Sequence, residues 1–168
     1  MAGAAIPTRV ARWTGTFPDV INVVLDTTNG ANVIPGSLVV TDTDGEVIIF
    51  GGGTDAVVLG VSLGTFQNAA GYGMPNNPSQ VTNRANTVPV AVANTDTVFE
   101  MSIVSSGSTY ADPALADIGD EYGVVLNSGI WAVDKAETST KIVHIVDIDT
   151  DRKTVFVKFL SAVCETLA

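Results

Sequence analysis

The sequence predicts an all-β fold, a small β-barrel or sandwich of about ten short strands. Short runs rich in β-branched residues recur along the chain, and turn-forming residues separate them. The stretch 30–63 shows this best, because Asp44-Gly45 joins two such runs in a tight hairpin and three glycines, 51–53, end the second run. At 168 residues the chain forms one domain, or two very small β-units that share a core.

The apolar runs place the strands along the chain. Within them, Gly60 marks a bulge or a close backbone approach, and Pro89, which has no N–H, indicates an edge or bulged position. Phe99, Met101 and Ile103 alternate with their neighbours and are expected to share one face. The expected strands are 19–25, 37–41, 46–50, 56–63, 87–93, 97–104, 122–126, 129–133, 141–149 and 154–160.

Three local features complete this assignment. Asp112-Pro113 favours one helical turn over 113–117, because aspartate caps a helix and proline suits its first position. Asn127-Ser128 is expected to turn a hairpin. The single histidine, His144, lies in mid-strand with no nucleophile or carboxylate beside it, so we expect it in the core and not in a catalytic site.

The chain divides into an extended N-terminal arm (1–18), a β-barrel or sandwich body (19–160) and a C-terminal tail (161–168) that forms a short helix or a tether. Residues 64–86 interrupt the body with five asparagines, no acidic residue and a single cation, which favours a contact loop. The arm and this loop carry the expected interface residues, which are Arg9, Arg12, Trp13, Phe17, Phe66, Tyr72, Met74 and Arg84.

The charge balance excludes two classes of partner. Eighteen acidic against eight basic residues give a net charge of −10, which argues against nucleic acid and against anionic membranes. Only 15% of the residues are charged, which suits a surface occupied by partner proteins.

One cysteine, Cys164, excludes an internal disulfide framework, and the N-terminus lacks the pattern of a secretory leader. We therefore expect folding in a reducing cytoplasm.

No stretch predicts a catalytic, cofactor or metal site, and we expect the protein not to be an enzyme. Asp147, Asp149 and Asp151 alternate as at the start of a calcium loop, but Arg152 stands where such a loop requires glycine. Alternating acids at a strand end more often form a solvated face that discourages edge pairing. A weak structural cation at the three aspartates stays open as the alternative.

Several segments together resemble the small β-barrel decoration, or cement, proteins of tailed-bacteriophage capsids. These segments are the glycine-led strand 35–40, the Asp-Gly hairpin 44–47, the run 58–61, and the stretches 87–101 and 123–134. The resemblance implies a virion protein, made in the host cytoplasm, that binds the outer surface of the head as a homotrimer. It would clamp neighbouring major capsid subunits against the pressure of the packaged DNA.

Two other functions fit the same composition. A tail-tube or other virion β-protein should form rings or tubes by itself. A carbohydrate-binding or adhesin module should show clustered exposed aromatic residues, whereas Trp13 and Trp131 lie far apart in the sequence.

Overall fold

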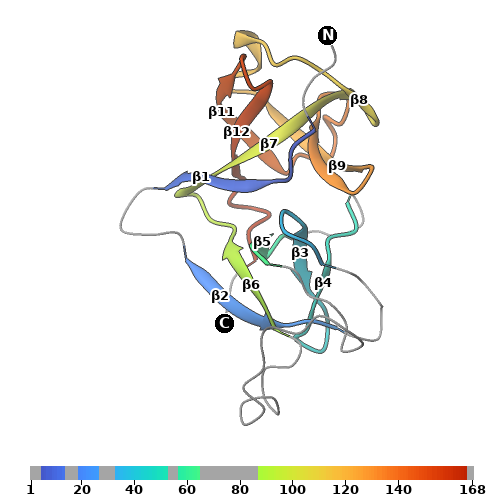
Figure 1. The fold of residues 1–168 in the computed structure, drawn as a ribbon, viewed down its shortest axis with the longest axis vertical. Coiled ribbons are helices and arrows are strands. Elements are labelled where there is room, and N and C mark those ends of the chain that lie inside the picture. Colours follow the sequence, from blue (N-terminus) through green and yellow to red (C-terminus); the bar gives the residue numbers. More distant parts are fainter. Residues whose placement is uncertain (1–4, 14–18, 27–32, 53–56, 65–86, 166–168) are drawn as a thin grey trace.

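The computed structural model describes residues 5–13, 19–26, 33–52, 57–64 and 87–165, and these ranges form two β-sheets (Figure 1). Twelve strands lie in the described residues, against the ten or so predicted, and the all-β prediction is confirmed. Two of the strands that the sequence did not predict are β1 (Arg9–Trp13) and β8 (Thr109–Tyr110). A short 3-10 helix, Leu115–Asp117, lies within the predicted helical turn, but its N-cap is Ala114, so the predicted cap at Asp112 and the predicted start at Pro113 are wrong.

The first sheet closes on itself. β7 (Thr97–Ser106) pairs with β10 (Ile130–Asp134), and the order continues through β9 (Glu121–Asn127), β11 (Val143–Asp149) and β12 (Thr154–Phe159). β12 then pairs back with β7, which completes a five-stranded barrel. The β7–β10 pair is parallel and the others are antiparallel. β1 and β8 attach to β7 outside this ring.

The second sheet has the order β2-β6-β5-β3-β4, with every pair antiparallel. Its strands are β2 (Val20–Val24), β3 (Leu38–Thr41), β4 (Val47–Ile49), β5 (Gly60–Ser62) and β6 (Thr87–Val92). An isolated bridge between Leu25 and Val47 joins the first strand of this order to the last. The second sheet therefore also curls nearly into a ring, below the first barrel in Figure 1.

Strand β3 shows how the two sheets share a core. Val39 points into the interior of the second sheet, where it packs in a cluster with Leu59 and Val90. Its neighbours Leu38 and Val40 point the other way, into a larger cluster that also holds the buried residues of the first barrel. Both faces of β3 are thus buried, which explains its continuous apolar sequence.

Two contacts outside the ladders tie the sheets together. The ring of Phe50, which follows β4, lies 5.5 Å from the ring of Trp131 on β10. The chain after β12 returns to the second sheet, where the N–H of Val58 donates to the carbonyl of Val163 at 2.7 Å. Residues 161–165 are therefore packed on the fold, and the expected short terminal helix is not present there.

The N-terminal segment is also held by its own chain. β1 pairs with β7 in antiparallel register, and the N–H of Ile6 donates to Ser102 Oγ at 2.7 Å. Thr8 is buried. Residues 5–13 of the predicted extended arm (1–18) are therefore attached to the fold, because this segment pairs with backbone groups of β7.

The two predicted hairpin turns each contain a glycine with positive φ, and one of the turns lies one residue from its predicted position. Gly45 has φ +80° and turns the predicted hairpin, but Asp44 is not in the positive-φ region, because Asp42 bonds to Glu46 and the three residues 43–45 form the turn. In the β9–β10 hairpin, Asn127 pairs with Ile130, so the turn residues are Ser128 (φ +53°) and Gly129 (φ +84°). The predicted turn was wrong by one residue, because a two-residue turn of this kind needs positive φ at both central positions.

Pro89 is not at an edge, because β6 lies between β2 and β5. Its carbonyl accepts a hydrogen bond from the N–H of Leu63 at 2.9 Å. The backbone N and C=O of one strand residue point toward the same neighbour, so the missing N–H faces Leu63, just beyond the end of β5. The edge prediction is wrong, and the proline is tolerated because the ladder with β5 ends there.

His144 lies on the outer side of its strand, so the prediction of a core histidine is wrong. Val143 and Ile145 on either side are fully buried, and alternation places the imidazole on the opposite face. Its partners in register are Lys158 and Glu121. The histidine therefore lies between two charged residues and is only partly buried.

Gly60 makes the close backbone approach that the sequence predicts. A Cβ at this position would overlap the carbonyl of Ala91 on β6. We expect Gly60→Ala to lower the free energy of unfolding by about 1–3 kcal/mol, the usual cost of overpacking a core. Urea denaturation followed by circular dichroism measures this. Gly107→Asn is the control, since a Cβ there meets open space and asparagine tolerates its φ of +53°; an equal loss in both variants would contradict the steric explanation.

Candidate functional site

Glu100 on the first barrel is a buried charged residue, with only 2% of its surface exposed. It lies on β7 between Phe99 and Met101, whose side chains point into the large core cluster. Alternation therefore places Glu100 on the outer face of the barrel. The side chains of Arg9, Arg152 and Thr154, which contact its carboxylate, contribute to this burial.

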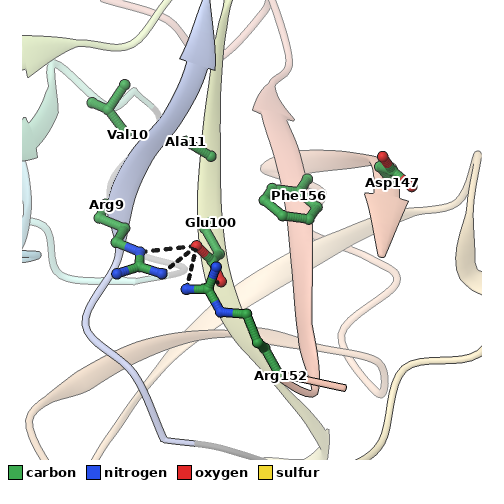
Figure 2. A pocket seen from close by; sticks show the side chains of 7 residues that line it. All are labelled: Arg9, Val10, Ala11, Glu100, Asp147, Arg152 and Phe156. Carbon is green, nitrogen blue, oxygen red and sulfur yellow. Dashed lines mark hydrogen bonds and ion pairs between the residues drawn. The ribbon is translucent and has the colours of Figure 1, made fainter. Parts of the chain in front are cut away.

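Three side chains hold this carboxylate, and two of them, Arg9 and Arg152, are drawn in Figure 2. Arg9 donates from Nε to Oε2 at 2.8 Å and lies 2.7 Å from the same oxygen through Nη2. Arg152 Nη2 donates to Oε2 at 3.0 Å and lies 2.8 Å from Oε1. The hydroxyl of Thr154, which is fully buried, donates to Oε1 at 2.8 Å. Both oxygens of the buried charge are therefore neutralised and hydrogen-bonded.

Local structure brings these groups together from three parts of the chain. Arg9 lies opposite Glu100 in the β1–β7 register. Arg152 comes from the β11–β12 turn, where the Oδ1 of Asp149 accepts the N–H groups of Asp151 and Arg152 at 3.0 and 2.8 Å. Asp149, one of the three alternating aspartates, therefore caps this turn and fixes the position of Arg152.

A shallow open groove of about 580 Å³ lies beside the buried carboxylate. A row of four residues from four adjacent strands crosses it: Arg9 on β1, Glu100 on β7, Phe156 on β12 and Asp147 on β11 are partners in register. Arg152, Val10 and Ala11 complete the lining. In Figure 2 the two guanidinium groups lie on one side of the Phe156 ring and Asp147 lies on the other.

Both arginines are anchored on Glu100 yet remain half exposed, with side-chain exposures of 53% for Arg9 and 49% for Arg152. A guanidinium has five N–H groups, and only those on Nε and Nη2 of Arg9 and on Nη2 of Arg152 contact the carboxylate. Two positive charges against one leave a net positive charge at this end of the groove. Asp147 supplies a negative charge at the other end.

The predicted interface residues fall into two groups. Arg9 is part of the groove, and Arg12 and Trp13 follow it on β1, where their backbones pair with Val98 and Thr97. Phe17 and the four loop residues lie outside the described residues; the loop residues are Phe66, Tyr72, Met74 and Arg84.

Sequence reasoning missed Glu100, Arg152 and Phe156 as members of a site. The available signal was weak: Glu100 is the one charged residue in the expected strand 97–104. In the sequence, Arg152 is notable only as the residue that breaks the calcium-loop pattern, and Asp147 as a candidate cation ligand. Among the described residues, no group of three His, Cys, Asp or Glu side chains could hold a metal ion.

Other ionisable groups have altered pKa values without forming a second site. Burial, and then the hydrogen bond from its hydroxyl to Asp120 at 2.9 Å, raises the pKa of Tyr122 to about 12. Burial raises the pKa of the Cys164 thiol, so the thiolate that acts as a nucleophile is disfavoured. Cys164 lines a smaller depression of about 360 Å³ at the junction of the two sheets.

No protein-family model, curated protein or solved structure matches this chain. Among the described residues, no helix has both the length and the apolar character to cross a membrane.

Proposed function

We propose that this protein is a structural, non-enzymatic component of a virion, which binds the outer surface of a phage capsid and clamps neighbouring major capsid subunits. Its sequence resemblance to capsid decoration proteins supports this function. The fold is compatible, because the closed first barrel and the nearly closed second sheet share one buried core. A homotrimer is the assembly that the resemblance implies.

An apolar face on the second sheet carries the proposal. Val20 and Val24 point outward from β2, with 48% and 45% of their surface exposed, and Asn22 between them lies opposite Pro89 on β6. Leu63, also 42% exposed, bonds to the carbonyl of Pro89 on the other side. We call Val20, Val24, Leu63 and Pro89 the β2 face. Neighbouring exposed apolar side chains of this kind mark interaction surfaces.

The β2 face also lies where the predicted contact loop begins and ends. Leu63 belongs to the face, and Thr87, the first residue of β6, pairs with Val24. Leu63 and Thr87, the described residues that flank the stretch 64–86 with its predicted aromatic and methionine contacts, therefore both lie at this apolar surface. We propose that the β2 face and this loop together contact the shell.

Cosedimentation with shells assembled from the major capsid protein of the same genome tests this function. Binding at saturation is expected for the natural chain, and replacement of both Val20 and Val24 by lysine should weaken it at least about tenfold, which corresponds to 1.4 kcal/mol. The matched control replaces Leu115 and Leu126, which are 77% and 48% exposed elsewhere, by lysine. Failure of the natural chain to bind any shell would overturn the proposal.

Light scattering of the purified protein separates the alternatives. A compact trimer is expected for a decoration protein. Rings or long tubes would instead favour a tail-tube protein.

A further inference from the structure

We propose that the groove beside Glu100 is a recognition site for a carboxylate side chain of a partner protein, held by Arg9 and Arg152. The site lies on the first barrel and is separate from the β2 face. Only the identity of the partner rests on the proposed function; the chemistry of the ligand comes from the groove itself.

The arginines are preorganised for this task. Because each already contacts the buried Glu100 carboxylate, both guanidinium planes are fixed before a ligand arrives, and little side-chain entropy remains to be lost. Within the described part of the chain, Nη1 of Arg9 and the Nε and Nη1 of Arg152 have no protein partner. These donors lie at the open groove, and the planar fork of a guanidinium matches the two oxygens of a carboxylate.

The charge of the whole chain selects the class of anion. A net charge of −10 repels phosphate-rich polymers and disfavours a dianion relative to a single carboxylate. At the arginine end of the groove, Glu100 cancels one of the two arginine charges, which leaves one unit of positive charge there to match one carboxylate. The Phe156 ring offers an apolar surface for the methylene groups of an aspartate or glutamate side chain.

Asp147 gives the proposal a second, opposite test. Its carboxylate lies at the far end of the same groove and repels an incoming anion. Removing this charge should therefore tighten binding, whereas removing an arginine should weaken it. A groove that is only a structural ion-pair cluster would show neither effect on a ligand.

The experiment is a titration of the full chain with sodium acetate and, separately, with inorganic phosphate, followed through the arginine Nε–H signals by NMR. Acetate is expected to shift the Arg152 signal with saturation. The control is Lys158→Gln, which removes one positive charge, as Arg9→Gln does, but lies outside the groove lining. It should leave the acetate affinity unchanged. Arg9→Gln, followed on Arg152, should weaken binding about tenfold, and Asp147→Asn should tighten it about twofold.

Circular dichroism of each variant shows whether it folds. If Arg9→Gln does not fold, Asp147→Asn still decides the question, since it retains every contact of Glu100. No saturable acetate shift, an affinity unchanged by Asp147→Asn, or binding of phosphate in preference to acetate would each overturn the carboxylate site. In the shell assay, Asp147→Asn should bind more tightly than the natural chain. If Asp147→Asn left the affinity for the shell unchanged, the groove would not be a partner site, and the proposed function would stand.

Discussion

Replacing Arg9 and Arg152 together by alanine should lower the free energy of unfolding by about 3 kcal/mol. Removing the partners of a buried charge costs about 3–5 kcal/mol, because the charge is left without compensation. The lower end applies here, since truncating two half-exposed side chains lets water reach Glu100. Of the three side chains that donate to Glu100, Thr154 alone would remain. Urea denaturation followed by circular dichroism gives the difference.

Two controls separate the buried network from ordinary surface charge. Lys141→Ala removes an exposed ion pair with Glu121, at 3.3 Å, and should cost less than about 1 kcal/mol. Adding Glu100→Gln to the double arginine variant should recover part of the loss, because a neutral amide is less costly to bury than a carboxylate. A double variant as stable as Lys141→Ala would contradict the assignment of Glu100 as a compensated buried charge.

Phe50→Ala is expected to lower the free energy of unfolding by about 3–5 kcal/mol, the usual range for truncating a buried aromatic residue. Phe50 is 1% exposed and packs on Trp131, so its removal leaves a cavity between the two sheets. The cost should be large because the surrounding strands belong to closed or nearly closed rings, which cannot collapse freely into the space. Thermal and urea unfolding both measure it.

The control for Phe50 is Leu115→Ala. Leu115 is 77% exposed, so its truncation should change stability by less than about 0.5 kcal/mol. A loss below 1 kcal/mol for Phe50→Ala would show that the sheets do not depend on this contact. It would indicate instead that other contacts between the strands of the two sheets, and the bridge between Val58 and Cys164, hold the sheets together.

Local chemistry in the sequence determined the all-β class and most of the strands. Phe99, Met101 and Ile103 share one face as predicted, and all three lie in the large core cluster, because the side-chain period of a strand is a property of the strand alone. The glycine at position 45 adopts the positive φ that its hairpin needs, and the close approach at Gly60 was readable from a glycine within an apolar run. These features depend on a few neighbouring residues, so the sequence suffices.

Tertiary structure decided which strands pair, and with them the groove. Arg9, Glu100 and Arg152 are up to 143 positions apart, and only the attachment of β1 to β7 and the closure of β12 on β7 bring them together. The errors at Pro89 and His144 have the same origin, since an edge position or a buried face depends on the neighbouring strand and on what packs over it. Sequence periodicity determines that two faces exist along a strand; pairing and packing determine which face is buried, and against what.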